Sequence, residues 1–233
     1  MTKYIDRYYL NGEMYGIKFG GWGWQPWANT LLYCNFNGNY DDTQWNTVTQ
    51  SYTPPTYSTT AQGEQYISVI WQWGSNNTLL TINPLTGLSW TWDYTVSCWV
   101  NPTDNGYLKV IRWYWMTMSN GTGLIISWNN EVTIFIYAWD INTGITITPD
   151  VWNNIIFTHT NWTHNIYLNW VLVDTRNLNF VFNNNRLWIL GDPNNWWNGL
   201  YGWLDEFIVE DRERTAQEIS DYYNQTKSLY GIS

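Results

Sequence analysis

The chain of 233 residues is poor in charge and in long apolar runs. Charged residues make up 12% of it, about half the share that is usual in globular domains. It has only 10 Lys and Arg against 19 Asp and Glu, a formal net charge of −9. Nucleic-acid binding depends on clustered Lys and Arg, so we expect no nucleic-acid partner. No apolar run reaches the roughly 18 residues of a membrane-spanning helix, so we expect no membrane insertion.

Cysteine is also scarce. The two cysteines, Cys34 and Cys98, are too few for a disulfide framework. Both lie in apolar, strand-like runs, so we expect two buried free thiols. A disulfide bond between Cys34 and Cys98 on adjacent strands is the alternative. The first seven residues, Met1–Arg7, contain no apolar segment, which predicts that no secretory signal peptide is present.

Aromatic residues are abundant instead. The chain has 20 Trp, 18 Tyr and 7 Phe, together 19% of its residues. A disordered chain lacks aromatics and is highly charged, so this chain should fold. Its length suits one all-β domain as well as two small domains.

Short β-rich runs alternate with clusters of Asn, Gly, Asp, Thr and Pro. In residues 94–100, Tyr94, Val96 and Cys98 face one way and the intervening residues the other, which predicts a half-buried strand. Many such strands at short spacing predict a sandwich or barrel. The expected strands are 4–10, 15–19, 30–36, 66–71, 78–82, 94–100, 108–115, 123–127, 132–138, 155–159, 165–173, 180–182, 186–190 and 204–209.

One segment near the C-terminus predicts a helix. Thr215 and Glu218 have the spacing of a capping box. Ile219, Tyr222 and Tyr223 follow at helical spacing and form one apolar face. We expect a short helix that packs on the sandwich.

Residues 1–28 look separate from the rest. Lys3 to Lys18 predicts a hairpin with Asn11-Gly12 at its turn, the strongest two-residue turn signal. Gly20 to Ala28 follows as a glycine- and tryptophan-rich linker. We therefore divide the chain into an N-terminal hairpin and linker, residues 1–28, and a β-domain, residues 29–233.

Five segments occur in an order that resembles the laminin-G-like, concanavalin A-like domains. They are 29–42 with its acidic turn, 93–100 and 151–158 with their tryptophans, the hairpin 165–173, and 202–209 followed by the helix. The resemblance implies an all-β, two-sheet antiparallel jelly-roll sandwich with a short C-terminal helix. It also implies binding of glycan or protein, such as a cell-surface polysaccharide, more often than catalysis.

The hairpin has a resemblance of its own. The pattern of Tyr4, Ile5 and Asp6 before Asn11-Gly12 resembles the start of tailed-phage structural and fibre proteins. This implies a virion protein on the virion surface, attached to other virion proteins through the hairpin and forming a homo-oligomer. The alternatives are a purely structural capsid or filament subunit and a bacterial surface adhesin, which would be extracellular or on the cell surface.

An enzyme would need an acid, a base or a nucleophile. Related jelly-roll glycosidases carry paired carboxylates along one strand. Here strict alternation would place Asp205 and Val209 on one face of the strand and Glu206 and Glu210 on the other. The sequence of this strand does not contain the paired-carboxylate motif of those glycosidases. His159 and His164 flank a predicted turn and cannot close a zinc site without further ligands, although a Ser/His/Asp triad stays open. We expect a non-enzymatic protein, with a glycoside hydrolase as the weaker alternative.

Calcium is the one metal that the sequence suggests, because Ca²⁺ takes carboxylate and carbonyl oxygens from loops. By the resemblance, Asp41, Asp42 and Asp205 correspond to positions that hold a structural calcium in some relatives. The alternative is an acidic turn that bonds its own backbone.

Tryptophan in Asn-rich loops suits a sugar platform, because an indole face covers the apolar face of a sugar while amides bond its hydroxyls. The best such loop contains Asn194, Asn195, Trp196 and Trp197. A second group in the linker comprises Trp22, Trp24 and Trp27.

Several tryptophans nevertheless stand where turn geometry favours glycine. Trp45, Trp162 and Trp170 follow polar residues in predicted turns, where φ is often positive and a bulky residue fits badly. Only Trp99 and Trp152 stand where the related domains have Trp. One hypothesis is UGA recoding: these codons are UGA, which some bacteria and their phages read as glycine. The competing interpretation is true enrichment of Trp for glycan contact.

Overall fold

The computed structural model describes residues 5–10, 13–19, 29–36, 44, 47–51, 56–59, 65–69, 79–82, 93–103, 108–114, 121–126, 129–136, 139–177, 187–189 and 202–233. Its strands are β1 (Ile5–Leu10), β2 (Glu13–Phe19), β3 (Thr30–Cys34), β4 (Val48–Ser51), β5 (Thr56–Thr59), β6 (Gln65–Val69), β7 (Leu79–Ile82), β8 (Tyr94–Pro102), β9 (Leu108–Tyr114), β10 (Gly121–Ile126), β11 (Glu131–Ile136), β12 (Trp139–Thr146), β13 (Asn153–Thr160), β14 (Thr163–Leu168), β15 (Val171–Asn177), β16 (Leu187–Ile189) and β17 (Gly202–Glu210).

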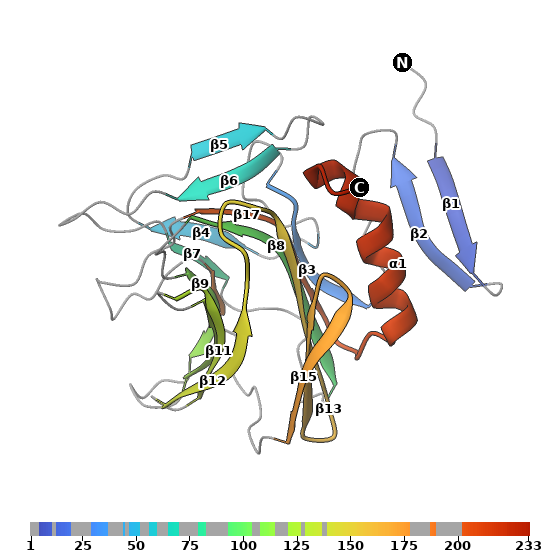
Figure 1. Ribbon diagram of the computed structural model, residues 1–233. Helices are drawn as coiled ribbons and strands as arrows, with labels where there is room; N and C mark the ends of the chain where they lie inside the picture. The colour runs from blue at the N-terminus through green and yellow to red at the C-terminus, as the bar shows by residue number, and fades with distance from the viewer. Residues whose placement is uncertain are drawn as a thin grey trace.

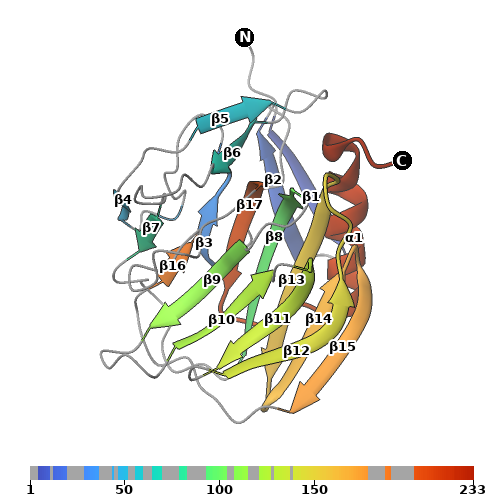
Figure 2. The same cartoon turned by 60° about the vertical axis from the view of Figure 1, so that its left-hand side comes forward.

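Two antiparallel sheets form a sandwich (Figures 1 and 2). One sheet has seven strands in the order β12-β11-β10-β9-β16-β7-β4. The other has eight strands in the order β15-β14-β13-β8-β17-β6-β5, and β3 also pairs with β17. The predicted all-β jelly-roll class with one short helix is therefore confirmed.

The main core lies between the sheets and includes the inward residues of β8. Tyr94, Val96, Cys98 and Val100 all belong to it, as the alternation predicts. The prediction that this strand is half-buried was wrong, because all nine of its residues are buried. Its outer face is covered by the C-terminal helix, which a count along one strand cannot reveal. Cys34 and Cys98 are buried free thiols, and burial raises the pKa of Cys98.

The helix α1 (Ala216–Thr226) and the 3₁₀ segment η1 (Lys227–Tyr230) run across the outer face of the eight-stranded sheet (Figure 1). The predicted capping box is present: the Thr215 hydroxyl accepts from the Glu218 amide, and the Glu218 carboxylate accepts from the Thr215 amide. A second core forms beneath the helix, where Trp99 and Ile156 of the sheet meet Ile219 and Tyr222. Within the part of the chain that is described, no helix is long and apolar enough to cross a membrane.

The N-terminal hairpin was also predicted. Strands β1 and β2 pair in a two-stranded sheet of their own, and the pairing of Leu10 with Glu13 leaves two residues for the loop. Strands β4, β5 and β12 were not predicted, because their largely polar runs lack a clear apolar face. The expectation of one strand over 165–173 was wrong, because a two-residue turn divides this segment between β14 and β15. The expected strand 180–182 lies outside the described residues.

Glycine at position 202 is required where β17 passes between its neighbours. Its φ is +142°, and a Cβ there would lie 2.3 Å from the carbonyl oxygen of Asn101. We predict that Gly202→Ala lowers the free energy of unfolding by about 2–4 kcal/mol through backbone strain and overpacking, as measured by urea denaturation. Gly144→Ala is the matched control, because its φ is +76° but no atom lies within 4 Å of the added Cβ. A loss for Gly202→Ala no larger than that of the control would contradict the prediction.

Candidate functional site

Most of the predicted site residues lie outside the described part of the chain. This holds for the glycan loop Asn194, Asn195, Trp196 and Trp197, and for the calcium candidates Asp41 and Asp42. Trp22, Trp24, Trp27 and Trp45 also lie outside it. Among the predicted ligand and metal residues, Asp205 alone lies in the described part of the chain, so its surroundings are described first.

A β-bulge in β17 sets the direction of its carboxylates. The register of β17 against β8 shifts between Asp205 and Ile208, and Glu206 has a φ of +49°. Both Asp205 and Glu206 therefore contact tyrosines of the second core, while Phe207 and Val209 enter the main core. The predicted assignment of Asp205 to the face of Val209 was wrong, because the bulge adds a residue and breaks strict alternation.

Asp205 and Glu206 are held by buried phenols. The Tyr230 hydroxyl donates to Asp205 Oδ2 at 2.8 Å, and the Tyr33 hydroxyl donates to Glu206 Oε1 at 2.7 Å. The other Asp205 oxygen accepts from the Glu206 amide at 2.8 Å. Burial, with the adjoining carboxylates, raises the pKa of both Tyr33 and Tyr230. Both phenols therefore remain neutral donors.

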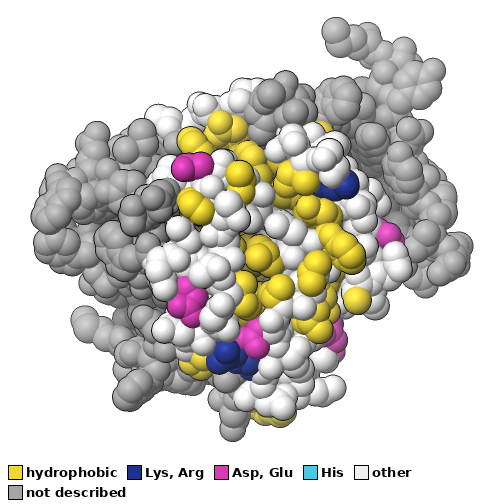
Figure 3. Space-filling view, in the orientation of Figure 1, with side chains coloured by type: hydrophobic (Ala, Val, Ile, Leu, Met, Phe, Trp, Pro, Cys, Tyr) yellow, Lys and Arg dark blue, Asp and Glu magenta, His cyan; other side chains and the backbone are white. Residues whose placement is uncertain are grey.

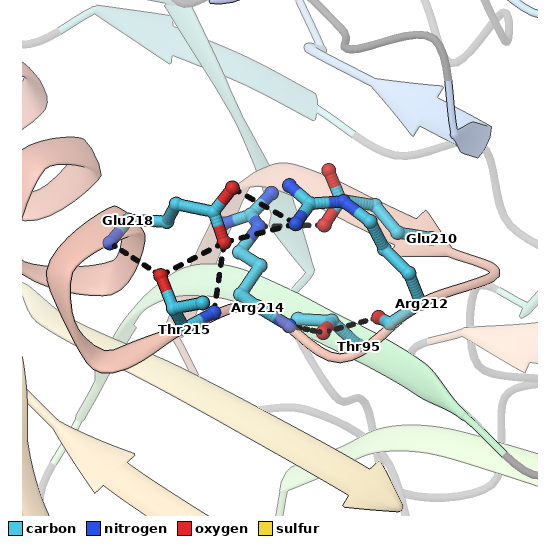
Figure 4. Close-up of polar contacts among 6 residues, drawn as sticks. All are labelled: Thr95, Glu210, Arg212, Arg214, Thr215 and Glu218. Atoms are coloured by element: carbon cyan, nitrogen blue, oxygen red, sulfur yellow. Dashed lines mark hydrogen bonds and ion pairs between the residues drawn. The ribbon is translucent and has the colours of Figure 1, made fainter. Parts of the chain in front are cut away.

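A second buried carboxylate, Glu210, is paired with Arg214. Glu210 Oε2 accepts from Arg214 Nε at 2.7 Å, and both side chains are fully buried. The Arg214 guanidinium lies 4.9 Å from the centroid of the Tyr222 ring. The Arg214 amide also donates to the hydroxyl of Thr95 in β8 (Figure 4). These bonds of Arg214 to Glu210 and Thr95 hold the segment between β17 and α1 against the sheet.

The start of α1 completes the network. Arg212 Nη1 donates to both carboxylate oxygens of Glu218 at 2.9 Å, and Glu218 also accepts from Thr215 (Figure 4). Burial by itself would raise the pKa of Glu218, but the hydrogen bonds from Arg212 and Thr215 outweigh it and lower the pKa. Asp205, Glu210 and Glu218 thus help to join the C-terminal segment to the sheet, while Glu206 bonds Tyr33 of the neighbouring strand β3.

The described residues contain no cluster of three or more His, Cys, Asp or Glu that could hold a metal ion. Both oxygens of the buried Asp205 carboxylate already accept hydrogen bonds, from Tyr230 and from the Glu206 amide. The other two calcium candidates, Asp41 and Asp42, lie outside the described residues, so the calcium site stays a prediction.

His159 and His164 lie opposite each other on β13 and β14, at the strand ends as predicted. Their rings stack with centroids 4.3 Å apart, and both side chains are buried. Tyr94 stacks on His159 and Phe157 on His164. The pair thus belongs to the packed interior, a role that the sequence spacing did not reveal.

One exposed apolar surface was missed by the sequence analysis. Trp170, Val171 and Leu172 are each about half exposed at the β14–β15 hairpin, and Val151 is similarly exposed. Strand β15 is an edge of the eight-stranded sheet. Apolar side chains are spread over the face in Figure 3, and the charged side chains seen there are scattered. The apolar run of residues 171–173 in the sequence could have indicated this exposed surface.

These features define an antiparallel β-sandwich in which a C-terminal helix covers the outer face of one sheet. The carboxylates Asp205, Glu206 and Glu210 of β17 are buried. The model of the concanavalin A-like lectin/glucanases superfamily, Laminin_G_3, matches residues 74–220, more than half of the chain. The chain belongs to this superfamily. No curated protein matches the chain in sequence.

Solved structures share the fold at low identity. Domain 4 of AbnA, an extracellular GH43 arabinanase from Geobacillus stearothermophilus in complex with arabinotriose, has a TM-score of 0.69 at 17% identity, over 84% of this chain and 98% of that domain. The botulinum neurotoxin serotype G binding domain gives a TM-score of 0.65 at 16% identity, over 88% and 54%. The botulinum neurotoxin DC binding domain in complex with rat synaptotagmin II gives a TM-score of 0.63 at 14% identity, over 86% of this chain and 52% of that chain. The chain thus spans about half the length of the toxin domains.

The bond from Tyr230 to Asp205 should be important for stability. We predict that Tyr230→Phe lowers the free energy of unfolding by about 1–3 kcal/mol, since a buried carboxylate oxygen loses its donor. Tyr223→Phe is the control, because Tyr223 stacks on the same Trp99 without touching Asp205. Equal effects of the two variants in urea denaturation would show that the bond contributes little.

His159 should make the fold sensitive to acid. Burial lowers the pKa of His159, partly opposed by Asp93 and by a backbone bond at Thr163. The neutral, buried imidazole therefore contributes fully to stability above about pH 6.5, the pKa of histidine in the unfolded chain. This contribution is lost as the pH falls from there through the lower pKa that His159 has in the folded state. We predict that the free energy of unfolding falls between pH 7.5 and 5.5, by at most about 1.4 kcal/mol per pH unit for this one group. His159→Phe should flatten this slope, and an unchanged slope would assign the pH dependence to other groups.

Proposed function

We propose that this protein is a non-enzymatic carbohydrate-binding module. The observation that carries the proposal is the burial of the β17 carboxylates within a lectin/glucanase-like fold. Asp205, Glu206 and Glu210 are at most 1% exposed and bonded to Tyr230, Tyr33 and Arg214. A general acid must reach the glycosidic oxygen of its substrate, and carboxylates beneath a helix have no such access.

Arabino-oligosaccharide is the first ligand class to test. It is the ligand present with domain 4 of AbnA, and that domain is matched over 98% of its length. A neutral oligosaccharide also suits a chain with few charges and a net charge of −9. We propose that Asn194 and Asn195 bond sugar hydroxyls and that Trp196 and Trp197 cover a sugar face.

We further propose that residues 1–28 attach the module to a larger assembly, as in a phage fibre or surface-decoration protein at the virion surface. The separate two-stranded sheet of β1 and β2 supports this, because a hairpin of its own can join another structure without disturbing the sandwich. The attached module would then present its loops to host glycans.

Binding without hydrolysis is the expected outcome with arabinotriose. We predict that isothermal titration detects binding and that chromatography finds intact arabinotriose after long incubation. Asn194→Ala/Asn195→Ala should weaken binding about tenfold or more, since each lost hydrogen bond is worth roughly 0.5–1.5 kcal/mol.

Asn224→Ala is the matched control, because Asn224 is exposed on α1 and bonds only Ser220 O and Oγ in the described contacts. Repeating the titration with calcium and with chelator tests the metal prediction at Asp41 and Asp42. Release of arabinose would overturn the non-enzymatic assignment. Failure to bind any glycan on an array, together with binding to a protein receptor, would overturn the carbohydrate assignment.

A further inference from the structure

Two hairpin turns share an uncommon backbone conformation. Pairing of Thr160 with Thr163 leaves Asn161-Trp162 as the loop between β13 and β14, and pairing of Leu168 with Val171 leaves Asn169-Trp170 between β14 and β15. The φ angles are +45° and +69° in the first loop and +49° and +70° in the second. Both central residues of each turn are therefore left-handed.

Such two-residue turns select their residues sterically. The left-handed region brings the Cβ of an L-residue close to the following carbonyl oxygen, so Asn-Gly is the preferred pair. Each loop has the favoured Asn first. Each then has Trp, a bulky residue, where glycine would be free of strain.

The surroundings give Trp170 little compensation. Its side chain is 48% exposed, and it is followed by the exposed Val171 and Leu172. Two other large residues with positive φ, Phe36 and Glu206, differ in being fully buried. The chain also uses glycine in this region of φ, at Gly144 and Gly231, both at +76°.

Other tryptophans have a clear structural role. Trp99 is fully buried in β8 and stacks on Tyr230 with ring centroids 4.2 Å apart. Trp152 contacts Tyr66 and Tyr230. Neither has a positive φ. The described tryptophans thus include two kinds, those that the core requires and those that occupy glycine-type turn positions.

We propose that residues 162 and 170 are encoded by UGA and are glycine in the protein as its source cell makes it, while Trp99 and Trp152 are encoded by UGG. The source cell would then carry a glycine tRNA that reads UGA. A cell with the standard code would stop at the first such codon, so full-length synthesis would need a cell that reads UGA as an amino acid, and only a glycine tRNA would give the native residue. The exposed indole of Trp170 would not be part of any ligand site.

The codons and the native protein test the proposal directly. We expect UGA at 162 and 170 and UGG at 99 and 152 in the gene. In protein from its source, the tryptic peptide between Arg112 and Arg176 contains positions 152, 162 and 170. Its fragment masses should give Trp at 152 and Gly at the two turns, so position 152 is an internal control. UGG codons, or a tryptophan mass at either turn, would overturn the proposal.

The steric basis has a separate test in recombinant protein with Trp at all these positions. Trp162→Gly and Trp170→Gly should each raise Tm by about 2–4 °C, the shift expected for removing modest strain in a chain of this size. Trp99→Gly should instead lower Tm sharply because it empties a packed site. A fall in Tm for both turn variants would contradict the steric basis and overturn the inference. The codons at Trp196 and Trp197 then decide whether the proposed glycan loop carries aromatic rings.

Discussion

The contact on which much of this structure depends is the aromatic stack between the eight-stranded sheet and the C-terminal segment. Trp99 belongs to the outer face of β8 and stacks on both Tyr230 and Tyr223, with ring centroids 4.2 and 5.6 Å away. A sandwich normally leaves its outer sheet faces in water. Here the stack covers one of them, so β8 and β13 are buried on both sides. The large apolar area of these rings makes the helix part of the core.

Covering that face has an electrostatic consequence. Carboxylates of β17 that would otherwise face water are enclosed, and an enclosed charge is tolerated only with bonded partners. Tyr230, Tyr33 and Arg214 supply these partners. The buried carboxylates of this acidic cluster thereby hold β17 to β3 and to the C-terminal segment. The proposed glycan binding would then fall to the loops, which is where binding residues commonly lie on a rigid scaffold.

Local patterns predicted much of the fold. The alternation of Tyr94, Val96 and Cys98, the capping box at Thr215 and the loop length of the first hairpin all depend on neighbours in the chain, and all are present. The bulge at Glu206 was not predictable in this way, because its left-handed backbone is accompanied by a bond to Tyr33, 173 residues away in sequence. Strands such as β5 were missed because their side chains have no continuous apolar face. Of the candidate site, the described part contains Asp205 alone.

The sequence by itself determined that the chain forms a sandwich or barrel of short strands, where the helix lies and that a turn lies at 161–162, since each follows from short-range periodicity and turn chemistry. The jelly-roll class and the hairpin within 165–173 were implied by the resemblance to laminin-G-like domains. Only the tertiary structure decided which side of the sheet each β17 carboxylate faces and that His159 and His164 stack in the interior. It also decided that the backbone at Trp162 and Trp170 has a left-handed conformation. These properties depend on contacts between strands distant in sequence, or on backbone angles that pairing imposes. No pattern along one segment contains that information.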